Sequence, residues 1–428
     1  MSIVNRYIKR RELPGVLPLL EGVSHPVLQR LYASRGITSA DQLARGAANL
    51  VPFNRLKGID VAVALLISAL EKQQHIVIVG DFDADGATST AVLLSGLKAL
   101  GFKFVEYLVP NRFEYGYGLT PPMAELAVAQ GAELIITVDN GISAIDGVAL
   151  AKKAGVKVLI TDHHLAGEQL PDADAIVNPN QPGCEFPSKA IAGVGVAFYL
   201  LLALRAALRE NGYFSETQPE PNLAELLDLV ALGTVADVVP LDSNNRILVY
   251  QGLMRIRSGH CRPGIQALID VANRSSQKLT ASDFGFALAP RLNAAGRLDD
   301  MSLGISCLLA KELGLARQYA AELDHLNVER RAIEQSMQTE AQAFLSQLSF
   351  DGTALPECLC LYRHDWHQGV IGILASRLKE RYHRPTIAFA DAGDGVLKGS
   401  ARSIPGFHIR DALDAVAARH PGLISKFG

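Results

Sequence analysis

The sequence has few cysteines, no long apolar run and no excess of charge of one sign. Its five cysteines form no CxxC pair and no zinc-ligand spacing, a pattern typical of the reducing cytosol, so we expect a cytoplasmic location. The longest apolar stretches, at 61–70 and 193–208, are too short or too interrupted to span a bilayer. The basic start of the chain lacks the apolar stretch of a secretory signal, and we expect no membrane association.

Charge is balanced over the whole chain but not locally. The 428 residues include 41 lysines and arginines against 44 aspartates and glutamates, a net charge of −3, which argues against a protein that coats nucleic acid with its whole surface. Residues 246–300 contain eight basic against four acidic residues, and residues 361–420 contain nine against six. A binding site for a polyanion should therefore be local and lie in the second half of the chain.

From residue 75 onward, short β-branched runs alternate with helical stretches. We predict strands at 75–80, 103–110, 133–138, 156–161 and 174–179. Two further helical runs, at 190–210 and 223–235, would cover the sheet. This alternation indicates βαβ units, and therefore an α/β fold with a doubly wound, mainly parallel sheet.

A stretch without glycine or proline runs from Leu315 to Leu348, with apolar residues at nearly helical spacing, and predicts one long connecting helix. Beyond it we predict a smaller α/β domain with strands at 358–363, 385–390 and 397–403 and a helix at 370–382. The length of the chain allows two or three domains. We predict an N-terminal helical segment (1–49), a catalytic domain (50–310), the connecting helix (311–349) and a substrate-binding domain (350–428).

Acidic and histidine side chains follow the ends of several predicted elements: Asp81, Asp83, Asp85, Asp139, Asp162, His163, His164 and Asp237. Ligands of open parallel sheets bind beyond the carboxyl ends of the strands, so these side chains converge if the strands are neighbours. Taken singly, such residues are more often a helix cap, a turn residue, or a structural or exposed side chain than a metal ligand. Together they predict a site for Mn²⁺ or Mg²⁺, because clustered carboxylates repel one another without a cation. Two ions about 3.5–4 Å apart would activate a water and stabilise the leaving oxygen of a phosphoester.

Eight blocks of the sequence resemble a known family. The four motifs of the DHH phosphoesterase superfamily are matched, in order and spacing, by GDFDADGATST, TVDNGIS, TDHHLAGEQLPDADAIVNPNQP and ALGTVADVVPL. Four further blocks resemble the RecJ branch of that superfamily: NRFEYGYGL, APRLNAAGRL, WHQGVIGILASRL and KGSARSI. The resemblance as a whole covers residues 75–428. It implies a DHH domain, a DHH-associated domain, and a hydrolase that digests single-stranded DNA from the 5′ end to nucleoside 5′-monophosphates in DNA repair and recombination. It also implies a single-strand-binding protein and a helicase as partners.

The resemblance implies a role for each residue of these motifs. The implied metal ligands are Asp83, Asp85, Asp139, His163 and Asp237, with Asp81 either a ligand or a supporting carboxylate. His164 would be a catalytic residue near the scissile phosphate, and Asp162 would orient the two histidines. Many family members have a histidine where this chain has Val79, so one imidazole is missing. We expect one or two ions, and this departure from the family pattern argues against a second site that is permanently occupied and favours one that fills only with substrate.

Basic and small residues in two blocks are candidates for phosphate contacts. In APRLNAAGRL, Arg291, Asn293 and Arg297 stand among small residues that allow close approach of a phosphate, although solvated arginines at a helix start explain the pattern equally well. Arg297 would also stabilise developing charge during the reaction. In KGSARS, an exposed loop is the more common explanation of Ser400 and Arg402, but the resemblance implies that they bind substrate phosphates and the 5′ end.

Two further residues are weaker candidates for nucleic-acid contacts. His367 precedes a glycine-containing helix, where a capped surface histidine is the more common explanation. Tyr115, with Tyr117, lies in a glycine-containing loop where an aromatic ring would stack on bases. Ordinary loop packing explains aromatic residues beside glycines more often.

The chain ends at PGLISKFG, before a glycine- and histidine-containing loop and an OB-like domain that the resemblance leads us to expect. We therefore expect an incomplete DHH-associated domain and no OB-like module. Three alternatives stay open. They are a phosphoesterase of the same superfamily acting on small nucleotides or short oligonucleotides, a non-catalytic DNA-binding fragment, and an acid-cluster phosphotransferase on another sheet fold. Activity on short and long substrates separates the first from an exonuclease.

Overall fold

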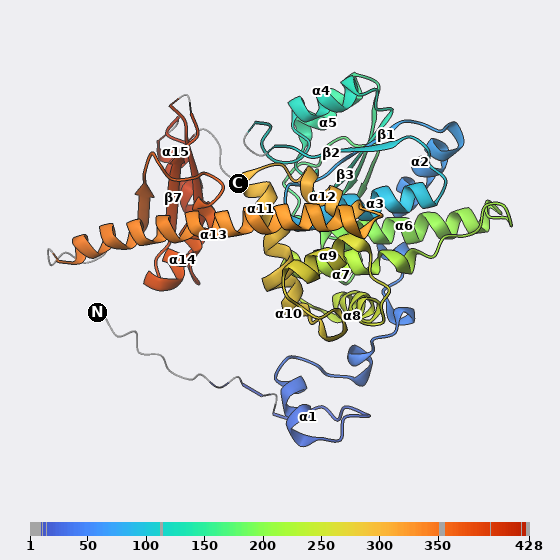
Figure 1. Ribbon diagram of the computed structural model, residues 1–428, viewed down its shortest axis with the longest axis horizontal. Coiled ribbons are helices and arrows are strands. Elements are labelled where there is room, and N and C mark those ends of the chain that lie inside the picture. Colours follow the sequence, from blue (N-terminus) through green and yellow to red (C-terminus); the bar gives the residue numbers. More distant parts are fainter. Residues whose placement is uncertain are drawn as a thin grey trace.

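The computed structural model describes residues 10, 12–13, 15–111, 114–350, 356–393, 395–420 and 422–424. A five-stranded sheet and a three-stranded sheet, each with its own helices, are joined by one long helix (Figure 1). No helix among the described residues is long and apolar enough to cross a membrane.

The larger sheet is parallel throughout, with the strand order β2-β1-β3-β4-β5. Its strands are β1 (Ile76–Val79), β2 (Val105–Leu108), β3 (Leu134–Val138), β4 (Lys157–Thr161) and β5 (Ala175–Val177). Every residue of β1 and β3 is buried, which explains their unbroken apolar runs. The strand order reverses between β1 and β3, and their carboxyl ends border the crevice where such sheets bind ligands. The predicted α/β fold with a parallel sheet is confirmed.

Helices cover both faces of this sheet, so it is doubly wound as predicted. One face packs against α2 (Ile59–Lys72), α3 (Ala84–Ala99) and α6 (Gly193–Glu210), and α7 (Leu227–Ala236) packs on α3 and α6. The other face packs against α4 (Pro121–Ala129) and α5 (Ile145–Lys153). Alternate side chains of β1 serve the two layers, since Ile76 and Ile78 face the first and Val77 and Val79 the second. The long apolar run of α6 is therefore a core helix.

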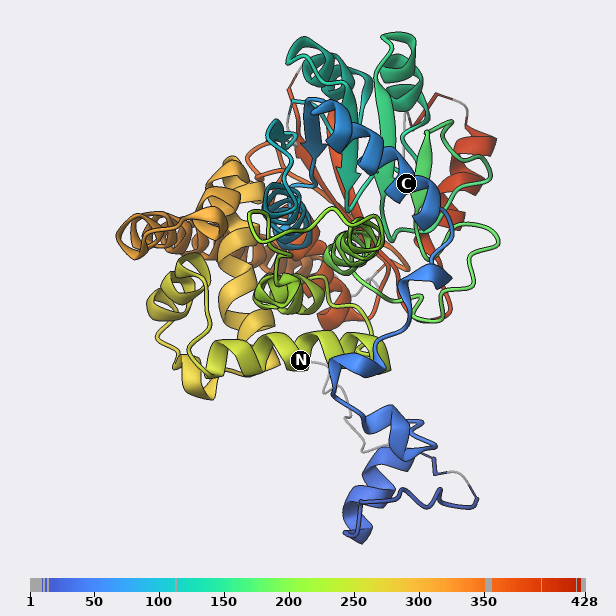
Figure 2. The ribbon, with the colours of Figure 1, turned by 90° about the vertical axis from the view of Figure 1, so that its right-hand side faces the viewer.

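Further helices extend the first layer: α8 (Ser243–Arg257), α9 (Pro263–Val271), α10 (Ala281–Asp283), a π-helical turn at Phe284–Leu288, α11 (Ala289–Leu298) and α12 (Ser302–Leu309). The segment from Gln42 to Val51 attaches to α8. Asn244 accepts a hydrogen bond from the backbone of Val51 (3.0 Å), and Arg246 donates to the carbonyl of Gln42 (2.8 Å). The segment around α1 (Pro26–Ala33) stands apart from the sheet (Figure 2).

α13 (Leu313–Phe350) is the long connecting helix that the sequence predicts. Its first half packs against α9, α11 and α12, and its second half against α14 (Ile371–Tyr382). Met337, Ala341 and Leu345 enter the small hydrophobic core of the second sheet. Figure 1 shows α13 running from one sheet to the other.

The smaller sheet has the order β6-β7-β8, with β6 parallel to β7 and β7 antiparallel to β8. Its strands are β6 (Leu359–Tyr362), β7 (Thr386–Asp391) and β8 (Leu397–Arg402), followed by α15 (Ile409–Arg419). α14 packs on this sheet, and Trp366 donates its indole N–H to Glu340 of α13 (3.1 Å). This arrangement is the smaller α/β domain that the sequence predicts.

Candidate metal centre

The loop between β1 and α3 carries the first group of carboxylates. Asp83 caps α3, because its carboxylate accepts hydrogen bonds from the backbone N–H groups of Asp85 (2.9 Å) and Gly86 (3.0 Å). Asp85 lies in the first turn and is buried. Its carboxylate accepts hydrogen bonds from the N–H groups of Gly193 (2.7 Å) and Val194 (3.0 Å) at the start of α6. Helix N-termini favour negative charge, so two helices hold these carboxylates in place.

Asp139 follows β3 in an uncommon backbone conformation. Its φ is +62°, in the left-handed region, where a residue other than glycine costs about 1–3 kcal/mol. The side chain is only 2% exposed. A Cβ atom placed on Gly193 would lie 2.6 Å from Oδ1 of Asp139. Helix α6 therefore approaches this carboxylate so closely that glycine is required at its first position.

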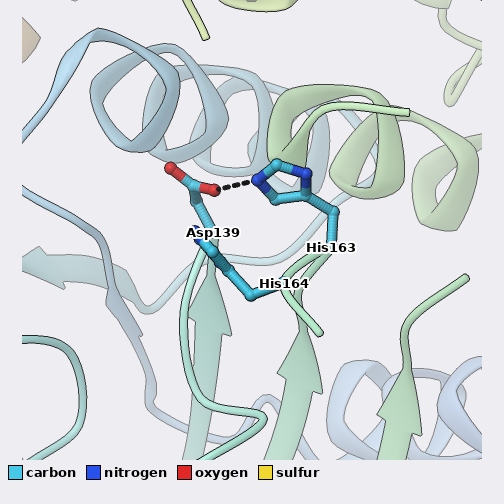
Figure 3. Close-up of side chains that lie close together, drawn as sticks. All are labelled: Asp139, His163 and His164. Carbon is cyan, nitrogen blue, oxygen red and sulfur yellow. Dashed lines mark ion pairs between the residues drawn. The ribbon is translucent and has the colours of Figure 1, made fainter. Parts of the chain in front are cut away.

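His163 lies where these elements meet. Its Nε2 is 3.1 Å from Asp139, 3.4 Å from Asp237 and 3.9 Å from Asp85. Figure 3 shows Asp139 and His163 pointing toward each other beyond the ends of the strands. Asp237 is the C-terminal cap of α7, and Val238 after it has a φ of +63°, which is rare for a β-branched residue. The ends of β1, β3, β4 and α7 thus supply one cluster.

The cluster fits a metal centre. Oδ1 of Asp139, Nε2 of His163 and Oδ2 of Asp237 are buried and make no hydrogen bond to any described residue. Such atoms are costly to bury unless they coordinate a cation. Three sets of three ligand atoms lie within 4.8 Å of one another: Asp81, Asp83 and Asp139; Asp85, His163 and Asp237; and Asp139, His163 and His164. Five carboxylates with imidazole suit Mn²⁺ or Mg²⁺, and the overlapping sets fit one or two ions.

Burial and mutual repulsion perturb the titration of this cluster. Burial, followed by the charge of neighbouring carboxylates, raises the pKa of Asp85 and Asp139 well above the usual range. The same causes raise the pKa of Asp237 to about 7. Burial lowers the pKa of His163 to about 4, which keeps its imidazole in the neutral form that binds metals. A divalent cation would therefore stabilise the ionised carboxylates.

His164 lies at the edge of the cluster and pairs with Asp162. The carboxylate of Asp162 lies 2.7 Å from Nδ1 of His164 and also accepts the backbone N–H groups of His163 (2.7 Å) and Ile142 (2.9 Å). Burial alone would raise the pKa of Asp162, but these bonds outweigh it and lower the pKa. Burial alone would lower the pKa of His164, yet the bond to Asp162 raises it to about 9. At pH 7 the pair is therefore an imidazolium beside a carboxylate, an arrangement that supports an orienting role for Asp162.

The charge of His164 is testable in the metal-free protein. We expect its ring to titrate near pH 9 in NMR spectra, and to titrate well below pH 9 in Asp162→Asn, because the burial that lowers its pKa remains. Because the folded pKa is raised, the pair stabilises the fold below about pH 6.5 and loses this contribution as the pH rises through 9. Asp172→Asn, at an exposed carboxylate paired with Lys152, is the control. An unchanged His164 titration in Asp162→Asn would show that Asp162 does not set this charge.

Two of the residues predicted to bind phosphate have partners within the fold. Arg291 forms an ion pair with Asp324 of α13 (2.8 Å). Asn293 accepts a hydrogen bond from the backbone N–H of Ala84 (2.8 Å), which ties α11 to the loop that carries Asp83 and Asp85. In this structure both side chains hold α11 in place, and their contact with phosphate stays a prediction.

Arg297 and His367 lie at the junction of the two domains. Arg297, near the end of α11, donates a hydrogen bond to the carbonyl of Gly369 (3.4 Å). His367 accepts one from the N–H of the same glycine (3.1 Å). A Cβ atom on Gly369 would lie 2.1 Å from the carbonyl oxygen of Arg297, so the two backbones touch. The structure thus brings Arg297 and His367 together from residues distant in the chain.

Arg402 and Ser400 lie on β8 and contact each other. The guanidinium of Arg402 donates to Ser400 (3.1 Å), to Ser376 of α14 (2.9 Å) and to the carbonyl of Ala401 (2.7 Å). No carboxylate among the described residues pairs with it, and its half-burial lowers its pKa. A half-buried positive charge without a counter-ion suits a bound anion.

The glycine-containing loop before α4 places its two tyrosines differently. Tyr115 packs against the apolar layer of α4 and α5. Tyr117 reaches the site, where its hydroxyl donates to the carbonyl of Asp139 (3.2 Å) and its ring meets those of Phe82 and His164 edge-on. Of the two tyrosines, Tyr117 is therefore the better placed to contact a substrate at the metal centre.

Three residues at the site had no assigned role in the sequence analysis. Gly193, which has no Cβ atom, leaves space for the carboxylate of Asp139. Asn178 donates to the carbonyl of His164 (3.0 Å), and Asn180 to that of His163 (2.6 Å). The two asparagines belong to the motif that contains both histidines, so the motif was the available signal. Nothing in the sequence near Gly193 indicates which side chain it approaches.

Comparisons with known proteins identify two domains and a set of close relatives. Residues 75–234 match the DHH family, N-terminal domain, and residues 355–428 match the DHHA1 domain. The single-stranded-DNA-specific exonuclease RecJ of Salmonella typhimurium is 59% identical over 99% of this chain and 73% of its own length. The protein of the same name from Bacillus subtilis is 39% identical over 91% of this chain and 48% of its own length.

Solved structures agree with these relatives. An exonuclease RecJ bound to manganese superposes with a TM-score of 0.71 at 35% identity, covering 84% of this chain and 85% of that one. RecJ from Thermus thermophilus in complex with Mn²⁺ superposes with a TM-score of 0.72 at 34% identity, covering 90% of this chain and 53% of that one. A complex of the same protein with Mg²⁺ also matches. With two family domains, a shared fold and a metal-ready cluster at the strand ends, the chain belongs to the RecJ family of the DHH superfamily.

Proposed function

We propose that this chain is a metal-dependent exonuclease that hydrolyses single-stranded DNA from its 5′ end to nucleoside 5′-monophosphates, in DNA repair and recombination. One observation carries the proposal: three buried ligand atoms without a hydrogen bond to any described residue converge beyond the sheet of a chain whose relatives are single-stranded-DNA-specific exonucleases. The Mn²⁺ and Mg²⁺ complexes of RecJ structures support these two ions as cofactors.

Each part of the site has a distinct task in this reaction. The ions would be held by Asp81, Asp83, Asp85, Asp139, His163 and Asp237, and when bound they supply the Lewis acidity that activates water and neutralises the phosphate. The chain itself supplies His164, which is hydrogen-bonded to Asp162 and would donate a proton to the leaving oxygen. Arg297 lies where the two domains touch and would stabilise charge that develops on the phosphate.

The digestion of labelled strands tests this proposal directly. With Mn²⁺, a 5′-phosphorylated, 3′-labelled single strand should shorten stepwise, while the same strand in a duplex should persist. Turnover of a dinucleotide alone would replace the proposal by a small-nucleotide phosphoesterase. Binding of the strand without turnover of any substrate would leave a non-catalytic DNA-binding fragment.

The second domain offers a place for the 5′ phosphate. Arg402→Ala should raise KM for a 5′-phosphorylated strand by about tenfold or more, because a charge-assisted bond to phosphate is lost. A strand with a 5′ hydroxyl should be affected much less. Arg384→Ala, at an exposed arginine of the same domain, is the matched control. Equal effects of Arg402→Ala on both strands would remove Arg402 from recognition of the 5′ end.

We also propose partners and a location for this activity. An exonuclease confined to single strands needs a source of them, so a helicase that opens duplex DNA and a protein that keeps single strands accessible are the expected partners. We propose a cytoplasmic location because none of the five cysteines forms a disulfide bond in the structure, as is usual for proteins of a reducing compartment.

A further inference from the structure

A pocket of about 660 Å³ opens beside His164. Its walls are the loop that leads into α4 and the loop that leads into α5, and its lining includes Asp162, His164 and Tyr117. None of the six predicted metal ligands lines it. Its volume lies within the range of about 300–1,000 Å³ that is typical of small-molecule sites.

The lining favours a base and a sugar over a phosphate. The apolar part comes from Leu119, Pro121, Ile142 and Ile145, together with the ring of Tyr117. No lysine or arginine lines the pocket, and the carboxylate of Asp146 would repel an anion. An apolar lining that includes an aromatic ring suits a nucleobase, whichever base it is, because every base has a π-face that can stack.

The position of the pocket indicates which nucleotide it receives. In an in-line displacement, the attacking water and the leaving oxygen lie on opposite sides of the phosphorus. Nε2 of His163 faces the carboxylates that would hold the ions. Nδ1 of His164 instead pairs with Asp162, and both His164 and Asp162 line the pocket. The attacking water, held and activated by the ions, would lie on the side of His163, so the leaving oxygen would lie on the opposite side of the phosphorus, beside the pocket. For cleavage from the 5′ end this oxygen is O3′ of the terminal nucleotide, since water adds to phosphorus, the P–O3′ bond breaks and O3′ takes up a proton.

We propose that this pocket binds the base and sugar of the 5′-terminal nucleotide, the one that leaves as the monophosphate. The proposal rests on the exonuclease function proposed above and assigns the place of one substrate group within it. None of the six predicted metal ligands lines the pocket, so residues on its outer wall such as Ser143 can be changed without replacing a ligand.

The test compares three 5′-phosphorylated single strands: an unmodified strand, one with a stable abasic residue at the first position, and one with it at the second. For the wild type, kcat/KM should fall by about tenfold or more when the first base is missing, and little when the second is missing. Ser143→Trp, at an exposed residue of the lining, should fill the pocket and bring the ratio between the first two strands near one. Ala149→Trp, on an exposed position of α5 outside the pocket, should keep the wild-type ratio.

The outcomes separate this proposal from the one on which it rests. Equal cleavage of the first two strands by the wild type, or dependence on the second base instead, would overturn the pocket assignment and leave the exonuclease intact. Failure of the wild type to shorten any strand would overturn the exonuclease proposal and the pocket assignment with it. Ile145→Trp is a second filling variant should Ser143→Trp not fold, and a wild-type ratio in a folded filling variant would again overturn the assignment.

Discussion

Asp139→Asn should abolish nuclease activity, lowering kcat on single-stranded DNA by about 10³-fold or more. Asp139 belongs to two of the three sets of ligand atoms, and its Oδ1 is the atom nearest to Nε2 of His163. An amide keeps the shape of the carboxylate but loses its charge, so the affinity for Mn²⁺ should fall as well. Turnover of labelled strands and calorimetric titration with Mn²⁺ measure the two effects.

In the metal-free protein, Asp139→Asn should not lower the thermal stability, although it abolishes activity. The raised pKa means that burial and neighbouring carboxylates destabilise the ionised group in the folded chain. Removing the charge should therefore leave Tm in EDTA unchanged or higher at pH 7, while activity is lost. Asp172→Asn, at an exposed carboxylate, should change neither quantity. Loss of activity together with a lower Tm in EDTA would indicate a structural role for Asp139 instead of a ligand role.

Gly193→Ala should weaken metal binding by about 10- to 100-fold, although residue 193 supplies no ligand. The added Cβ would lie 2.6–2.8 Å from three side-chain atoms of Asp139, so either that carboxylate or the start of α6 must shift. The same shift would disturb the hydrogen bond from Gly193 to Asp85. Titration of Mn²⁺ binding, followed by nuclease assays at saturating Mn²⁺, measures the loss and how far excess metal restores activity.

A glycine elsewhere in the fold provides the control for this substitution. A methyl group added at Gly314, near the start of α13, would meet no atom of the described residues within 4 Å, so Gly314→Ala should leave metal binding unchanged. Wild-type Mn²⁺ affinity in Gly193→Ala would show that the start of α6 can shift to accommodate the methyl group, and that metal binding does not require a glycine at residue 193.

The sequence predicted the parallel sheet and the positions of its strands because buried parallel strands are short, β-branched and separated by helices of similar length. It also predicted which residues follow the strand ends, and the structure brings Asp85, Asp139, His163 and Asp237 within a few ångströms. The ligand roles themselves, and the domain boundaries at residues 49, 310 and 349, stay predictions.

Contacts between distant segments could not be predicted from local pattern. Arg291 and Asn293 stand in a motif typical of phosphate binding, yet in this structure they pair with Asp324 and with the backbone of Ala84. Which of two tyrosines in one loop reaches the site depends on the path of the loop, which glycines at positive φ set. The approach of α6 to Asp139 depends on helix packing, which no single segment encodes.

The predicted metal ligands are spread along the chain from Asp81 to Asp237, on elements that come together only when the parallel sheet has formed. Such pairings between distant segments form late and slowly, so an unfolded chain offers no ready-made cage for a divalent ion. An ion that binds only the folded form adds RT ln(1 + [ion]/Kd) to its stability. Binding of manganese would thus shift the equilibrium toward the folded chain. Chelation would therefore lower the stability of the fold as well as stop catalysis.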